Sequence, residues 1–297
     1  MNIFKNRETP SQNIAFISIM ASLNVIFVLI TSFIPLLSFS LIFVLPFFSS
    51  IVGLICKKRY YPIYAFSSLA LSALILFFQL SDAIFYLFPA IIVGMVFALL
   101  IEKRFPPIWI IFITSLLHLV ITYASIPLID FLFGISLVET FINALGLSSF
   151  AYNDFLVPIF IYVLSLIQII ISYIIVETGL IKFNKAITAK NDNLLIDTIV
   201  ELIFILLSVL FAFVYGPISL LCFSFSLFFG VYFFAKYIEL KNRTIIIILG
   251  VSVIVSLFCF LALYKFIPKP FSILINEIFF AIECIINVSN IYLEKKG

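Results

Sequence analysis

The sequence has little charge, little glycine and almost none of the residues that build metal or cofactor sites. Only 10% of its 297 residues are charged, 9 are glycine, and histidine and tryptophan each occur 1 time. The 4 cysteines lie far apart and form no CxxC pair, which argues against a structural zinc site or a haem-attachment site. We therefore expect no cofactor and no bound metal, and we interpret the cysteines as small apolar residues.

Enzyme signatures are also missing. The sequence contains no H-E-x-x-H, no G-x-S-x-G and no G-x-x-x-x-G-K-[ST], and it has no second histidine for a triad. We therefore predict that the chain is not an enzyme and does not itself hydrolyse ATP. Its net charge of +3 is too small to indicate nucleic-acid binding.

Apolar residues dominate instead. They make up 65% of the chain, whereas soluble domains contain roughly half apolar and a quarter charged residues. This composition predicts an all-α, multi-pass membrane protein that lies in a lipid bilayer. The abundance of Phe, Ile, Asn and Lys is typical of an AT-rich bacterial genome, so we expect a bacterial cell membrane.

Long apolar runs predict the membrane helices, because a helix needs about 20 apolar residues to cross the hydrocarbon core. A polar start and no A-x-A-type cleavage site indicate that the first run is a retained span. The ten predicted runs cover residues 14–34, 39–56, 61–80, 84–101, 108–129, 155–176, 196–214, 217–235, 245–264 and 271–291.

Basic residues predict the orientation of these spans, since Lys and Arg accumulate on the cytoplasmic side. With both termini in the cytoplasm, every basic residue except Lys265 and Lys269 falls in a cytoplasmic segment. The polar internal segment 182–195 then predicts a linker between a six-helix bundle, residues 1–181, and a four-helix extension, residues 196–297. The long external segment 130–154 contains enough apolar residues for a re-entrant or interfacial helix.

Polar residues at the outer ends of the first bundle are the candidate ligand site. Solvated loop charge is the alternative for each of them. The candidate ligand-binding residues are Asp82, Tyr86, Asp130, Glu139, Asn143 and Asp154.

Two further groups of residues lie within the predicted spans. Small side chains of the first span, Ala15, Ser18, Ala21 and Ser22, suit either a partner-docking face or packing inside the bundle. His118 and Gln168 are intramembrane polar residues that either contact a ligand or hold helices together. Glu177 and Glu201 flank the linker, so we predict that both are interfacial.

The stretch NEIFFAIECIINVSN, residues 276–290, places Glu277 and Glu283 in an apolar setting. We predict that it belongs to the tenth span, with a surface amphipathic helix as the alternative. Asn276, Glu283, Asn287 and Asn290 would share one helix face, turned towards other helices or an aqueous crevice, and Glu277 would lie on the next face.

Residues 1 to about 180 resemble the substrate-binding S component of an energy-coupling factor (ECF) transporter. The resemblance rests on six spans and on the passages NIAFISIMASLNVIF, SLIFVLPFFSSIVGLICKKRYYPIYAF and AIIVGMVFALLIEKR. The chain length and the four extra spans look closer to the YybS-like group of bacterial membrane proteins, which are related to S components.

This resemblance implies a bundle that captures a vitamin-like micronutrient from outside and relies on a transmembrane coupling protein and cytoplasmic ATPases for uptake. S components dock through an AxxxA-type face on the first helix, and this sequence departs from that pattern with Ser18 and Ser22. The rival hypothesis is a membrane scaffold or assembly protein that binds no ligand. A self-contained secondary transporter is the third, although no two-fold internal similarity is visible.

Overall fold

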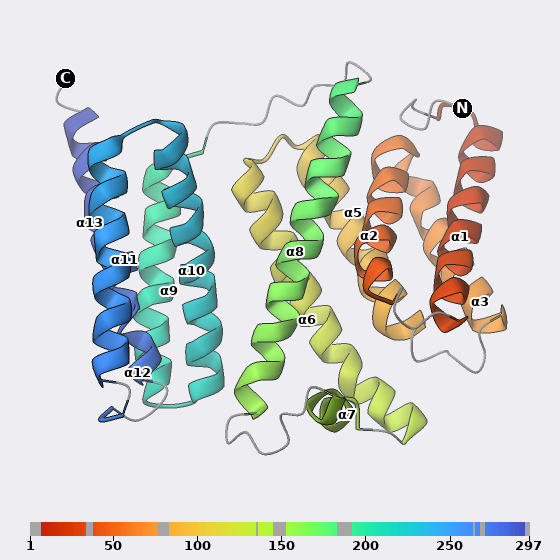
Figure 1. Cartoon of the computed structure of the whole chain (residues 1–297). Coiled ribbons are helices and arrows are strands. Elements are labelled where there is room, and N and C mark those ends of the chain that lie inside the picture. The colour runs from red at the N-terminus through yellow and green to blue at the C-terminus, as the bar shows by residue number, and fades with distance from the viewer. Residues whose placement is uncertain are drawn as a thin grey trace. The chain divides into compact units, whose positions relative to one another are not determined.

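A computed structural model describes residues 7–33, 38–75, 83–134, 136–144, 153–182, 192–263, 265–267 and 271–294 (Figure 1). Within these ranges the regular structure is entirely helical, as the apolar runs predict. The elements are α1 (Pro10–Phe33), α2 (Ser38–Ile55), η2 (Lys58–Tyr60), α3 (Tyr61–Ile75), η4 (Ala83–Leu87), α5 (Phe88–Glu102), α6 (Pro107–Phe133), α7 (Leu137–Ala144), α8 (Asn153–Lys182), α9 (Leu194–Ala212), α10 (Gly216–Glu239), α11 (Arg243–Leu263), α12 (Phe271–Leu274) and α13 (Glu277–Glu294).

Seven of the described helices are long and apolar enough to cross a membrane. They comprise Pro10–Ile30, Phe85–Glu102, Pro107–Phe133, Val157–Ile181, Leu194–Ala212, Gly216–Glu239 and Arg243–Leu263. A shorter apolar helix covers Val44–Ile55. The protein is therefore an integral, multi-pass membrane protein.

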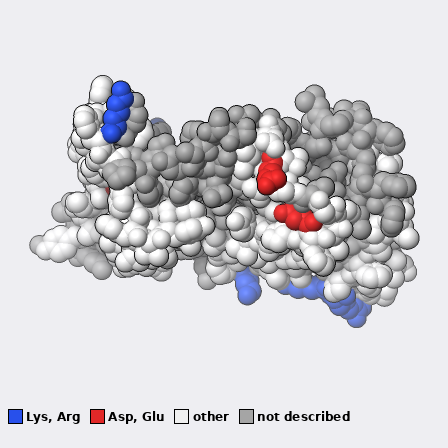
Figure 2. Space-filling view, turned by 90° about the horizontal axis from the view of Figure 1, so that it is seen from below, with Lys and Arg blue, Asp and Glu red and all other residues white. Residues whose placement is uncertain are grey.

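Large apolar side chains on the helix flanks support the same conclusion. Ile247 and Phe258 of α11 are 64% and 67% exposed, and Leu206 of α9 is 62% exposed. Figure 2 shows one face on which most described side chains are neither acidic nor basic. Exposed apolar surface of this extent is suited to lipid and unusual in water.

The chain divides into two compact units. The first comprises Met1–Asn153 and Phe160–Lys190, and the second comprises Asp154–Ile159 and Asn191–Gly297. Most of the predicted linker, residues 183–191, lies outside the described part of the chain.

Small residues bring α2 and α5 together in the first unit. An added Cβ at Gly94 would lie 2.3 Å from the Ser49 Cβ and 2.9 Å from the Ser49 carbonyl carbon. An added Cβ at Gly53 would lie 2.6 Å from the Ala98 Cβ. These two helices therefore pack backbone against backbone, which is how small residues drive association in lipid.

A buried polar network joins α1, α2 and α3. The Asn24 side-chain amide donates to the Tyr64 hydroxyl over 2.7 Å and to the Ser68 hydroxyl over 3.2 Å. Ser49 Oγ lies 3.0 Å from the same Tyr64 hydroxyl. Because water is absent from a bilayer interior, these contacts satisfy groups that would otherwise be costly.

Basic side chains gather at one end of the first unit, where α1 and α3 begin and α2 and α5 end. Lys58 Nζ lies 2.6 Å from Glu102 Oε2, and the Lys57 backbone N–H donates to Asn13 Oδ1 over 2.9 Å. The Arg7 N–H donates to the Ile55 carbonyl in the same region.

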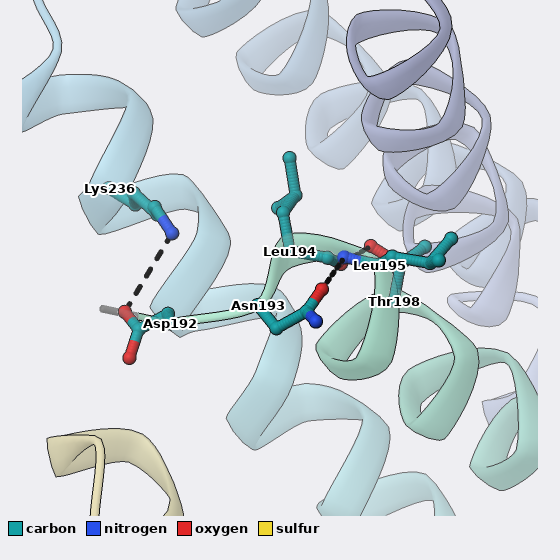
Figure 3. Close-up of polar contacts among 6 residues, drawn as sticks. All are labelled: Asp192, Asn193, Leu194, Leu195, Thr198 and Lys236. Atoms are coloured by element: carbon teal, nitrogen blue, oxygen red, sulfur yellow. Dashed lines mark hydrogen bonds and ion pairs between the residues drawn. The ribbon is translucent and has the colours of Figure 1, made fainter. Parts of the chain in front are cut away.

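Residues Asp192 and Asn193 define the start of α9 in the second unit (Figure 3). The Asn193 side chain caps the helix by accepting hydrogen bonds from the N–H groups of Leu195 and Ile196. Asp192 Oδ2 lies 3.7 Å from Lys236 Nζ of α10. Burial raises the pKa of Asp192, and the nearby Lys236 charge opposes that shift.

Candidate functional site

A small cavity lies among η4, α6 and α8 in the first unit. Its volume is about 40 Å³, enough for roughly one water-sized molecule. Its lining residues are Phe85, Tyr86, His118, Thr122, Ile161, Leu164 and Gln168. η4 is a π-helical turn, an irregularity that often occurs at functional sites, and it contributes the two aromatic side chains.

The orientation of His118 follows from its hydrogen bonds. Nδ1 lies 2.7 Å from Ser165 Oγ and 3.4 Å from Thr122 Oγ1. The Ser165 hydroxyl donates to the Ile161 carbonyl over 2.7 Å, so it accepts from His118 Nδ1–H. In a neutral imidazole this leaves Nε2 as a hydrogen-bond acceptor.

Gln168 also lines the cavity. Gln168 is 2% exposed, and its Oε1 has no hydrogen-bond partner among the described residues. A buried acceptor without a partner is costly. The polar residues His118, Thr122 and Gln168 in the lining make the cavity suited to a small polar group.

The predicted ligand-binding residues do not all converge on this cavity. Tyr86 lines it. Asp130 instead holds the start of α7, because its Oδ1 accepts the Leu137 N–H over 2.9 Å. Glu139 and Asn143 are exposed on α7, the short helix that occupies part of the predicted external segment. Asp82 and the side chain of Asp154 lie outside the described part of the chain.

The small residues of the predicted docking face point in different directions. Ala21 is fully buried in the core of the first unit, whereas Ala15, Ser18 and Ser22 are exposed. Ser18 Oγ donates to the Ile14 carbonyl in its own helix. The exposed members remain the candidates for contact with a partner.

The C-terminal acids lie in the interior of the second unit. Glu283 is 0% exposed, Glu277 is 5% exposed, and Asn287 is also fully buried. The predicted single helix over 271–291 is wrong in one respect, because a turn at Ile275 and Asn276 separates α12 from α13. Asn276 Nδ2 donates to the Ile273 carbonyl at this break, so it does not extend the α13 face.

Glu201 corrects another prediction. It was expected at the membrane interface, yet it is 0% exposed inside the second unit. A signal for this was present, since Asp197, Glu201, Ile205 and Ser208 recur at helical spacing on α9, and all four are buried. Because Glu201 is close to the polar linker in the sequence, we predicted an interfacial position and overlooked that this face of α9 points into the unit.

Comparisons with protein families, with curated proteins and with solved structures give no match for this chain.

Proposed function

We propose that the protein is a ten-span bacterial cell-membrane protein with both termini in the cytoplasm, whose first unit binds a small ligand. The gathering of Arg7, Lys58 and other basic residues at one end of the first unit supports this orientation. Glu139, on α7, would then face outside.

Cysteine labelling tests the orientation. In intact cells, Glu139→Cys is expected to react with a membrane-impermeant maleimide, and Lys103→Cys only after permeabilisation. Both positions are exposed, so accessibility within the fold does not bias the comparison. Labelling of Lys103→Cys in intact cells would refute the orientation.

The proposed ligand-binding role is the one that the resemblance to S components implies. It would make the protein a substrate-binding subunit that captures a vitamin-like compound from outside and relies on a coupling protein and ATPases for uptake. The observation that carries this proposal is the cavity lined by His118, Thr122 and Gln168. The scaffold hypothesis predicted no polar pocket between the helices of the first bundle.

The dimensions of the cavity limit the ligand. A space of about 40 Å³ accepts one small polar group, so a vitamin-sized compound would require η4 to move away from α6 and α8. The polar lining residues His118, Thr122 and Gln168 favour a ligand that carries a small polar group, such as an amide, amine or hydroxyl.

Thermal unfolding of the purified chain with a panel of water-soluble vitamins tests ligand binding. A compound at 100 times its Kd would stabilise the fold by about 2.7 kcal/mol. We expect this stabilisation to disappear in Gln168→Leu and to persist in Glu139→Gln, whose side chain is exposed.

Two results would overturn the ligand role. One is that no compound shifts the melting temperature, and the other is that Gln168→Leu responds like the wild type. Absence of any shift would favour the alternative function, a non-transporting membrane scaffold. Reconstitution with a purified coupling protein and its ATPases would test docking separately.

A further inference from the structure

Three glutamates occupy the interior of the second unit. Glu201 lies on α9, and Glu277 and Glu283 lie on α13, which packs against α9. All three are at least nine-tenths buried, a rare situation for this residue type. Acids in such positions are costly and usually functional.

Neutral groups are the hydrogen-bond partners of these acids. Cys284 Sγ donates to Glu201 Oε2 over 3.1 Å, and Ser208 Oγ donates to Glu277 Oε1 over 2.5 Å. Among the described residues, neither carboxyl oxygen of Glu283 has a hydrogen-bond partner. One turn further along α13, the side-chain N–H group of the fully buried Asn287 also has no partner in the described part of the chain.

No basic side chain balances these acids within the part of the unit that the structure describes. Among the described residues, none of the buried side chains is Lys, Arg or His. Lys236 of α10 pairs with Asp192, and Arg243 of α11 is exposed. The remaining titratable groups on the helices around the acids are Asp197, Cys222, Tyr232, Tyr237, Glu239, Cys259, Cys284, Tyr292 and Glu294.

A protonated carboxyl is the form that suits these surroundings. An ionised carboxylate in an apolar interior without a cation is very costly, whereas a neutral carboxyl needs only ordinary hydrogen bonds. A metal ion is a poor alternative, because no three or more His, Cys, Asp and Glu of the described residues are grouped to hold one. We propose that Glu201, Glu277 and Glu283 form a proton-binding site inside the second unit.

Polar side chains continue from this site along α13. The Tyr237 hydroxyl donates to Asn287 Oδ1, and Asn290 Nδ2 donates to the Tyr237 hydroxyl over 3.0 Å. At 1.5 Å per residue, the distance from Glu277 to Asn290 is about 20 Å, most of the roughly 30 Å hydrocarbon thickness. This row places polar side chains along α13 beside the acids, but among the described residues no hydrogen bond joins Asn287 to Glu283. Protonation of an acid forms an O–H bond on a carboxylate oxygen.

Infrared difference spectroscopy of the full chain in lipid tests the proposal. The C=O stretch of a protonated carboxyl is separate from the amide bands, and labelling with ¹³C-glutamate identifies it as glutamic. We expect this band in the wild type near neutral pH, with an intensity that falls as pH rises. Glu283→Gln is expected to remove one component of the band, and the exposed Glu239→Gln to leave the buried-carboxyl band unchanged.

Three outcomes would overturn the proposal. The first is no protonated-glutamate band in the wild type at neutral pH. The second is a band unaffected by Gln at each of positions 201, 277 and 283. The third is loss of the band on adding Na⁺ or K⁺ at constant pH, which would make the site a cation site. Because Gln is isosteric with neutral Glu, the variants are expected to fold, and unchanged thermal unfolding at neutral pH checks this.

Discussion

Gly94 is the position at which one methyl group is expected to damage the first unit most. In Gly94→Ala, the new Cβ would lie 2.3 Å from the Ser49 Cβ, more than 1 Å inside an ordinary van der Waals contact. The Ser49 carbonyl carbon and the Ser50 backbone nitrogen are both 2.9 Å away, so a rotamer change cannot relieve the contact. The helices α2 and α5 must therefore separate.

The size of the effect follows from two opposing contributions. Overpacking costs about 1–3 kcal/mol, and a clash with backbone belongs at the upper end of that range. Replacing Gly by Ala inside a helix stabilises the helix by about 1 kcal/mol, because Ala has the higher helix propensity. We therefore expect Gly94→Ala to lower the free energy of unfolding by about 2 kcal/mol.

A thiol-reactive dye provides the assay. Cys56 is buried where α2 ends, so in a variant that keeps only this cysteine, dye labelling on heating reports unfolding of the first unit. The matched control is Gly250→Ala on α11, because no described atom lies within 4 Å of its added Cβ. It is assayed with Cys222, which is buried in the second unit, as the remaining cysteine. The control is expected to be neutral or slightly stabilising.

A Gly94→Ala protein as stable as the wild type would refute the close packing of α2 and α5. The double variant Gly94→Ala with Ser49→Gly adds a second test, since removing the Ser49 Cβ is expected to recover part of the loss. Loss of the Ser49 contact with Tyr64 limits that recovery.

Three further predictions concern helix ends, each measured by thermal unfolding. Asn193→Ala removes two hydrogen bonds at the start of α9 and is expected to cost about 1 kcal/mol, whereas Asn193→Asp is expected to retain most of that stability. Gly134→Ala is expected to cost about 1–2 kcal/mol, because Gly134 ends α6 at φ 66° and Ala is strained there; a neutral result would contradict that conformation. The raised pKa of Asp192 means that the folded state holds its proton more tightly than the unfolded state, so this group's contribution to stability falls as pH rises above its ordinary value of 3.8. Asp192→Asn is expected to reduce the change of melting temperature with pH in this range. An unchanged dependence on pH would show that Asp192 does not have a raised pKa in the folded state.

Apolar patterning predicted the helical character of the described residues, because lipid requires every backbone group to pair within its own helix. Ten spans were predicted, and seven of the described helices are long and apolar enough to cross a membrane. The direction of individual side chains was harder to predict. Glu201 stands near a polar linker, and only its helical spacing with Asp197 and Ser208 indicates that it is buried. The break before α13 was missed because Asn276 and Glu277 were treated as members of a continuous helix.

The sequence predicted only some of the residues that line the candidate ligand site, and the reason is physical. Tyr86, His118 and Gln168 come from three separate elements and meet only through tertiary packing, which a sequence pattern does not encode. Asp130 was selected because it is acidic and near a predicted outer end, yet its oxygen is used by the Leu137 backbone. A charge at a helix end does not show whether it serves a ligand or the chain itself.

The hydrogen bond between Asn24 and Tyr64 has a consequence for biogenesis. Its two residues are 40 positions apart, so Asn24 emerges from the ribosome well before its partner. A lone α1 in lipid would carry an unpaired amide, which disfavours its release from the insertion machinery as a single helix. The first three helices should therefore leave the translocon together, and a chain truncated before Tyr64 should remain associated with it.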